Sequence, residues 1–520
     1  MRSALACAVM AASLLSPFAV QAFDRCDALL GNPDKLREFL IESGIRAAPV
    51  KYFDHARSIQ IDLDGAGRLI PFAKHDRQGR AVVVYPSAFP PVLCRMALAT
   101  FLELEGERAP LVEAAREAGI CVAARGGSPT CITEYARDLE QRYRARFAGL
   151  AASDQELAYG IATHALGQVA KHEFAHHFLR HAERIPSRRI ARIDAEFEAD
   201  FYAILNGAQA GEAPSAMYYF FNALAEMEGH ASALNTPNYE SAACRATNID
   251  DVTKLFGVVA MMLLDTVEGG GRVRDPTFTF RAVAEDFAGQ AAPAPSPKSC
   301  GRLNQVVLRE AHAELTRLAA LVAEYADYLP RTPGAADLQQ GLGLTEPEIF
   351  KLIDRLQAMS QDLTHLRGLA ARAMSLLVLR VGYGGASFEV SEQLDRAVQS
   401  FAGDTLSGDY GRLLKVQGLN ALYHAPDRPL EARLEQAGRL FEASVRHLPQ
   451  AAEGWMNLAY IALVRGDCEK AVELATESIR WADDDRNADM ARTFRDAVRE
   501  GSRSGRCAQM AKDFAATLTP

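Results

Sequence analysis

Beyond its first two dozen residues, the sequence lacks a long apolar run. The longest candidate, LFGVVAMMLL at residues 255–264, has about half of the ~20 apolar residues that a membrane span requires, and it is better explained as a buried helix. We therefore expect no transmembrane segment. The chain also lacks an excess of positive charge, with 57 Lys and Arg against 66 Asp and Glu and a net charge of −9. This balance gives no indication of a nucleic-acid or anionic-membrane partner.

Cysteine is scarce, with nine in 520 residues. The chain begins MRSALACAVMAASLLSPFAVQAFDRC, in which Arg2, an apolar run and small residues before Ala22 predict a secretory signal peptide over residues 1–22. Its removal takes Cys7 and leaves eight cysteines. An even number in an exported chain indicates disulfides, with buried free thiols as the alternative. These features favour a periplasmic location, or else secretion.

Eight cysteines allow ~105 pairings, but two pairs are suggested by their positions. Cys121 and Cys131 bracket CVAARGGSPTC, a loop short enough to be closed locally. Cys468 and Cys507 could join neighbouring helices near the end of the chain.

The length and the local patterns predict a mainly α-helical chain with a small β portion, in two domains. Short strands are expected within residues 57–86, where alternating apolar runs are separated by turn residues. Helices are expected at 91–118, 134–148 and 190–206, and residues 155–185 are expected to form one long helix or two abutting ones. The Pro- and Ala-rich segment 288–300 is the predicted linker, so the first domain covers 23–287 and the second, nearly all helical, covers 301–520.

A helical repeat is indicated near the C-terminus. In AEGWMNLAYIALVRGDCEKAVELATESIRWADDD, Trp455, Leu458 and Ala471 have the spacing of a tetratricopeptide unit. One period earlier, Ala437 and Phe441 give a partial second match. The second domain is therefore predicted to be a tetratricopeptide-like solenoid, with an ordinary helical bundle as the alternative. Stacked helix pairs tend to leave a concave surface for a protein partner.

The strongest chemical motif is HEFAH. His172 and His176 are four residues apart, so on a helix they lie on one face and can offer ring nitrogens to the same ion. Glu173 lies beside them, near enough to act on a water at the ion. His181 follows His172 by nine residues, which at ~100° per residue places it on the opposite side of a continuous helix. His181 and His177 are therefore expected to be bystanders, on the surface or in a second layer.

The segment DAEFEADFYAILNG supplies the expected third ligand. It follows Pro186 and a predicted turn, so the chain can reverse and bring a second helix against the first. Glu196 and Asp200 share one face of that helix, while Glu198 points away. One carboxylate can bind zinc, and the other can accept the N–H of a histidine ligand. Two helices supplying His, His and Glu make a gluzincin site.

HEFAH followed by EFEAD resembles the HtpX-like and CAAX-prenyl-protease-like zinc metallopeptidases. The resemblance implies one Zn²⁺ per chain, held by His172, His176 and Glu196, with Glu173 as the catalytic acid/base and Asp200 behind a ligand. With the signal peptide and the repeats, the layout is most similar to the periplasmic BepA-like protease-chaperones. The site motifs span about thirty residues, and the repeats add about seventy.

The sequence departs from this family at two points. The 24 residues from His172 to Glu196 are a short interval for it. The family's downstream histidine, which acts on the transition state, is replaced by Thr236 in NTPNYESAACR, and Arg245 is too far along the chain to match the motif. Tyr239 or His230 is the candidate replacement donor.

The resulting expectation is an exported zinc endopeptidase that cuts misfolded or stalled envelope proteins. Its helical repeats would dock the substrate or an envelope complex. The segment GRAVVVYP, residues 79–86, is a candidate edge strand for pairing with an extended substrate, with an interior strand as the alternative. Two other hypotheses stand beside the peptidase: a zinc-containing chaperone or adaptor that cleaves weakly or not at all, and a helical scaffold without metal.

Overall fold

The structure is a computed structural model, and the chain divides into two compact units, residues 1–48 with 52–326 and residues 49–51 with 327–520. The signal peptide, the linker, His230 and Tyr239 lie outside the residues that the structure describes. Apart from single residues between 313 and 399, the described ranges are 32–63, 71–86, 89–103, 109–125, 129–209, 216–228, 241–252, 402–423, 428–482 and 485–518.

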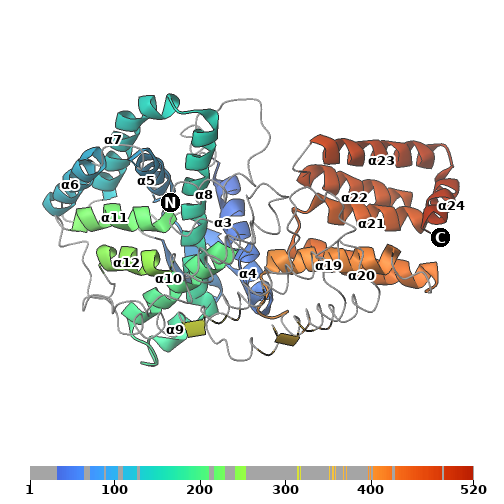
Figure 1. Ribbon diagram of the computed structural model, residues 1–520, viewed down its shortest axis with the longest axis horizontal. Coiled ribbons are helices and arrows are strands. Elements are labelled where there is room, and N and C mark those ends of the chain that lie inside the picture. Colours follow the sequence, from blue (N-terminus) through green and yellow to red (C-terminus); the bar gives the residue numbers. More distant parts are fainter. Residues whose placement is uncertain are drawn as a thin grey trace. The chain divides into compact units, whose positions relative to one another are not determined.

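The first unit is built mainly of helices, drawn in blue to green in Figure 1. The prediction of a mainly helical chain with few strands is confirmed over the described residues. The helices are α3 (Pro33–Arg46), η1 (Val50–Tyr52, shared with the second unit), α4 (Phe53–Ser58), α5 (Phe89–Glu103), α6 (Ala109–Ala124), α7 (Pro129–Ala148), α8 (Ala152–Phe178), α9 (His181–Arg184), α10 (Arg192–Gln209), α11 (Ala216–Glu228) and α12 (Ala242–Val252).

Helix α8 is the centre of this unit, with α3, α5, α10 and α11 packed around it. Small residues let its neighbours come close. A Cβ on Gly44 of α3 would lie 2.5 Å from the ring of Phe174, so α3 can cross α8 at this point only with glycine. Alanines 158, 162, 165, 170 and 175 of α8 are fully buried. The site residues of α8 are thus held on a helix that is surrounded by packing.

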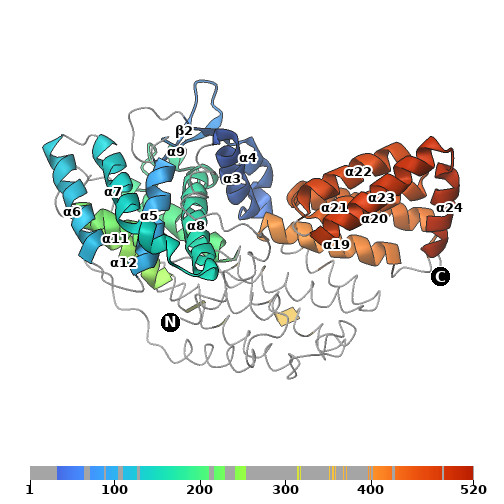
Figure 2. The same ribbon diagram turned by 90° about the horizontal axis from the view of Figure 1, so that it is seen from above.

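A three-stranded sheet lies against α8, with β1 (Gln60–Asp62), β2 (Phe72–His75) and β3 (Ala81–Val84) in the order β1-β3-β2. β3 is parallel to β1 and antiparallel to β2, and all four of its residues are buried. The expectation that residues 79–86 form an edge strand was therefore wrong, and the interior alternative is correct. An apolar run is equally compatible with either position until both of its neighbours are known. β2, labelled in Figure 2, and β1 are the two outer strands of this sheet among the described residues.

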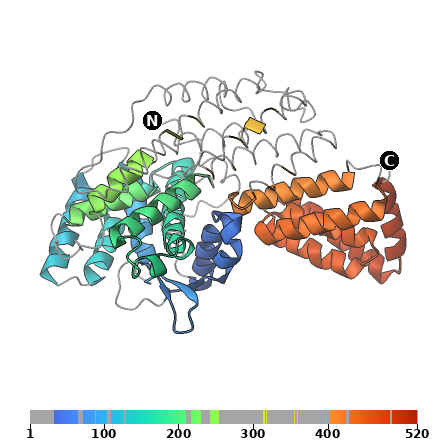
Figure 3. The same ribbon diagram turned by 90° about the horizontal axis from the view of Figure 1, so that it is seen from below.

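The second unit contains six described helices in sequence, α19 (Ser407–Tyr423), α20 (Leu430–His447), α21 (Ala452–Val464), α22 (Cys468–Trp481), α23 (Asp485–Arg503) and α24 (Cys507–Thr517) (Figure 3). Each packs against the next, and short connections make them hairpins. Gly466, with φ +79°, and Asp467, whose side chain caps the N-terminus of α22, form the turn between α21 and α22. The helix pair predicted from residue 452 onward is thus present, while its assignment as a tetratricopeptide repeat stays a prediction.

Both suggested disulfides are present. Cys121–Cys131 has a Cα–Cα distance of 5.7 Å, and Cys468–Cys507 has one of 6.2 Å. Cys94 and Cys244 are disulfide-bonded as well. These bonds are compatible with an oxidising compartment. In the described part of the chain, no helix is both long and apolar enough to cross a membrane.

Candidate metal centre

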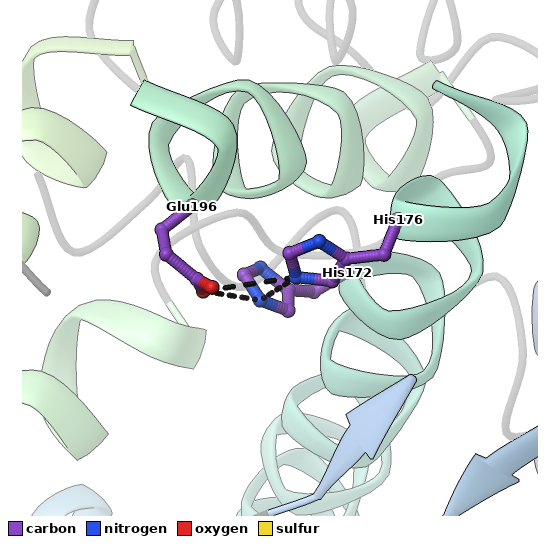
Figure 4. Close-up of side chains that lie close together, drawn as sticks. All are labelled: His172, His176 and Glu196. Atoms are coloured by element: carbon purple, nitrogen blue, oxygen red, sulfur yellow. Dashed lines mark hydrogen bonds and ion pairs between the residues drawn. The ribbon is translucent and has the colours of Figure 1, made fainter. Parts of the chain in front are cut away.

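The centre is formed where α8 and α10 run against each other. After Phe178 the chain turns through α9 and the segment around Pro186, then reverses into α10 at Arg192. His172 and His176 project from one face of α8 toward Glu196 of α10 (Figure 4). The helix reversal predicted from the sequence is therefore confirmed, as is the convergence of these three side chains.

The three side chains present their donor atoms to a common point. Nε2 of His172 lies 3.2 Å from Nε2 of His176, and Oε2 of Glu196 lies 3.3 Å and 3.7 Å from these two atoms. Ligands at about 2.0–2.1 Å from an ion in tetrahedral arrangement would be separated by about 3.3 Å. His172 and Glu196 are buried, and His176 is partly buried. The trio could therefore hold a metal ion without a large rearrangement.

His172 is oriented by a carboxylate and an arginine. Its Nδ1 lies 2.8 Å from Oδ1 of Asp200, one turn beyond Glu196 on α10. Arg245 of α12 donates from Nε and Nη2 to the two oxygens of Asp200, at 2.8 Å and 2.7 Å. Burial alone would raise the pKa of Asp200, but Arg245 and His172 lower it to about 2. An ionised Asp200 can only accept hydrogen bonds, so its position beside Nδ1 favours a proton on that atom and directs the Nε2 of the ring to the trio.

His176 is oriented differently, because its Nδ1 faces another imidazole. Nδ1 of His181 lies at 2.7 Å, and Nε2 of His181 lies 3.1 Å from Oε2 of Glu198. His181 is only 1% exposed. His181 thus lies in the second layer, one of the two positions expected for it, but the expectation that it lies on the opposite side of the helix was wrong, because it assumed a continuous helix. α8 ends at Phe178, and Arg180 has a left-handed φ of 54°, which turns the chain so that His181 points back to His176.

The trio concentrates negative charge around one position. The two histidines hold the pKa of Glu196 well below its usual range, although burial opposes the shift. Burial alone would lower the pKa of His172, but Asp200, Glu196 and Glu173 raise it to about 10. With both Nδ1 atoms facing partners, the two Nε2 atoms and Oε2 of Glu196 need a positive charge among them, either a proton on His172 or a metal ion.

Glu173 lies next to the trio and takes no part in holding it. It is 5% exposed, its Oε2 has no hydrogen-bond partner among the described residues, and its carboxylate receives the backbone N–H of Ala73 in β2. Burial raises the pKa of Glu173 to about 7, with His172 opposing this shift and Glu196 adding to it. The hydroxyl of Tyr85, after β3, is also buried and has no hydrogen-bond partner in the part of the chain that the structure describes; burial and the charge of Glu173 raise its pKa.

His177 points away from the trio, as the helical spacing predicted. Its Nε2 lies 3.3 Å from the carbonyl of Val82, and its ring lies against those of His55 and His75. It is buried, however, and does not lie on the surface. Burial lowers the pKa of His177 to about 4, despite the bond to Val82.

Two residues of the centre were missed in the sequence. Arg245 was set aside because its distance along the chain does not fit a motif, yet α12 brings it to Asp200. His181 was set aside because the helix was assumed to continue past Phe178. Each of them contacts a carboxylate of α10, Asp200 for Arg245 and Glu198 for His181, and these contacts become visible only after α10 is placed. Tyr239 and His230 are outside the described residues, so their proposed role stays a prediction.

Comparisons with protein-family models, characterised proteins and solved structures found no match to this chain.

Proposed function

We propose that the protein is an exported zinc endopeptidase. The observation that carries the proposal is the convergence of two imidazole nitrogens and one carboxylate oxygen at separations of 3.2–3.7 Å. Two nitrogens and one oxygen suit Zn²⁺, whose catalytic sites use three protein ligands and leave one position open. His172, His176 and Glu196 would hold the ion, one per chain.

The residues of the site would have separate roles in the reaction. Bound zinc would supply Lewis acidity, activating water and polarising a peptide carbonyl. Glu173 receives a proton from water on its carboxylate and delivers it to the leaving amine. Burial raises the pKa of Glu173, which makes its carboxylate a stronger proton acceptor, and bound zinc would oppose this shift. Asp200 and Arg245 keep the ring of His172 in its ligating orientation.

The substrate class we propose is extended or unfolded protein, including misfolded envelope proteins. Its main chain would lie along β2, which we prefer to β1, the other outer strand, because the Ala73 N–H of β2 reaches Glu173. The helical second unit, with tetratricopeptide-like spacing, would dock the substrate or a partner complex. The disulfides and the signal-like N-terminus support an oxidising location, for which the periplasm is our proposal.

Metal analysis is the first test of this proposal. The purified mature protein is expected to contain about one zinc per chain, and Glu196→Gln is expected to lose it because one charged ligand is removed. Glu183→Gln, which changes an exposed carboxylate on α9, is the matched control and should keep the zinc. Absence of zinc from the wild type, even after reconstitution, would remove the peptidase from consideration.

Hydrolysis is the second test. Glu173→Gln should keep the zinc and reduce cleavage of an unfolded protein substrate by at least about 100-fold, because the proton acceptor is lost. Cleavage rates and zinc content are measured on the same preparations. Hydrolysis by Glu173→Gln at the wild-type rate would show that Glu173 does not have this role.

A second candidate is a zinc-containing chaperone or adaptor that cleaves weakly or not at all. The observation in its favour is that Arg245, the guanidinium beside the centre, is already bonded to both oxygens of Asp200. It is thus not directed at the position where negative charge would develop during hydrolysis. A zinc-loaded wild type that suppresses aggregation of an unfolded protein without cleaving it would favour this candidate.

A further inference from the structure

We infer that His181 is a positioning residue for the metal centre, which fixes the protonation of His176 so that Nε2 of that ring is free to bind metal. The inference rests on the proposed zinc binding and adds a second layer to it. Its basis is a continuous chain of contacts, from Nδ1 of His176 to His181 at 2.7 Å and from His181 to Glu198 at 3.1 Å.

The contact at Glu198, the last in this series, sets the direction of the hydrogen bonds in the series. Arg184 donates from Nη1 and Nη2 to the two oxygens of Glu198, at 2.7 Å and 3.0 Å. A carboxylate held by a guanidinium in this way stays ionised and can only accept hydrogen bonds. Nε2 of His181 must therefore carry the proton that Glu198 accepts.

The same logic continues through the two imidazoles. A neutral His181 with its proton on Nε2 has a lone pair on Nδ1, which can only accept. Nδ1 of His176 must then donate to it, and the lone pair of His176 is left on Nε2, the atom that lies 3.2 Å from Nε2 of His172. The opposite direction would place the lone pair of His181 against the carboxylate of Glu198, and would place an N–H of His176 at the centre of the trio.

This series of contacts gives a separate role to each of the three carboxylates between Glu196 and Asp200 of α10. Glu196 faces the trio, and Asp200, one turn later, backs His172 directly. Glu198 projects from another side of the helix, and the imidazole of His181 lies between it and His176, in contact with both. The left-handed Arg180 and the short helix α9 place His181 there.

Zinc affinity tests the inference. The wild type and its variants are titrated with Zn²⁺ in competition with a chelator of known affinity. His181→Phe keeps the ring volume and removes both nitrogens, and it should weaken zinc binding by about 10–100-fold. His181→Asn should recover most of this loss, because its amide oxygen can accept from Nδ1 of His176. His177→Phe, on the adjacent buried histidine, is the control and should stay within about twofold of the wild type.

Two outcomes would overturn the inference. Wild-type affinity in His181→Phe would show that His176 needs no such partner, and equal losses in His181→Phe and His181→Asn would show that His181 only fills space. If His181→Phe does not fold, Glu198→Met replaces it, because this variant removes the final acceptor from a partly exposed position. It should weaken zinc binding by at least about threefold, whereas Glu183→Met should not, and equal affinities would again overturn the inference. A wild type that binds no zinc defeats the proposed function itself, before any variant is compared.

Discussion

The two units bury polar side chains for different purposes. In the first unit, buried His172, Glu196 and Asp200 face one another and other charged side chains, and their bonds join side chain to side chain. In the second unit, buried Ser444 and Ser478 donate to the backbone carbonyls of Gly411 and Ala452.

Arg433 of α20 follows the pattern of the second unit. Its guanidinium is buried and donates to the carbonyls of Leu422 and Leu518, at 2.9 Å and 3.0 Å. These bonds satisfy carbonyls at the ends of helices, which would otherwise lose hydrogen bonds on burial. A buried polar group that bonds to backbone therefore supports the fold, whereas a cluster of buried ionisable groups directed at each other carries a desolvation cost that a bound ion can offset.

This difference predicts that damage to the second unit changes stability and leaves the metal site unaffected. The largest effect is expected from removing the disulfide that closes 39 residues. Replacing Cys468 and Cys507 by Ser should lower the free energy of unfolding of that unit by up to about 4 kcal/mol, since the unfolded chain gains conformational entropy. Denaturant unfolding measures the loss, and zinc affinity should not change by more than about twofold.

The matched control for this prediction is a disulfide of the first unit, Cys121–Cys131. Replacing Cys121 and Cys131, which are separated by 10 residues, should cost up to about 3 kcal/mol in the first unit. If the change in the second unit weakened zinc binding as much as the one in the first unit, the proposed separation between the units would be wrong.

The metal site should depend on pH in a way that follows from His172. Its pKa of about 10 in the metal-free site means that the ring is protonated at pH 7, and the proton must leave when metal binds. Zinc affinity is therefore expected to rise about tenfold per pH unit between pH 6 and 9, with about one proton released per ion. Burial lowers the pKa of His176, which disfavours a second proton on that ring. Competition titrations across this range test the slope, and a pH-independent affinity would contradict it.

The smallest expected effect concerns the backbone at Arg180. A residue other than glycine in the left-handed region is strained by its Cβ, so Arg180→Gly should raise the free energy of unfolding of the first unit by about 0.5 kcal/mol. Arg180→Ala removes the same side chain but keeps the Cβ, and it should give no gain. Thermal unfolding of the two variants distinguishes strain from the loss of the arginine itself, and equal behaviour would rule out strain.

The sequence predicted the part of the centre that depends on regular helix geometry. His172 with His176 and Glu196 with Asp200 are each four residues apart, and this spacing alone places each pair on one face. The position of His181 could not be predicted, because the chain turns after α8 at the left-handed Arg180. Arginine is not a residue type that indicates a left-handed conformation. Arg245 could not be assigned either, since its contact with Asp200 exists only after α12 has packed.

The order of the strands in the sheet also depends on contacts between segments and could not be predicted. The sequence indicated short strands within residues 57–86, and the structure has β1, β2 and β3 there. The sequence could not predict the order of the strands, because an apolar segment such as β3 is compatible with an edge position and with a central one. Which strand is outermost is decided by pairing between segments, and no local pattern records it.

The last helix, α24, is fastened at both of its ends. Cys507 at its start is bonded to Cys468, and the carbonyl of Leu518 just after its end is held by Arg433. The end of a chain ordinarily frays first, and its amide hydrogens exchange with solvent fastest. Here the amides of α24 should exchange only when the whole second unit opens. A protease that cuts transiently opened segments would therefore find α24 no more accessible than the helices α20 and α22 to which it is bonded.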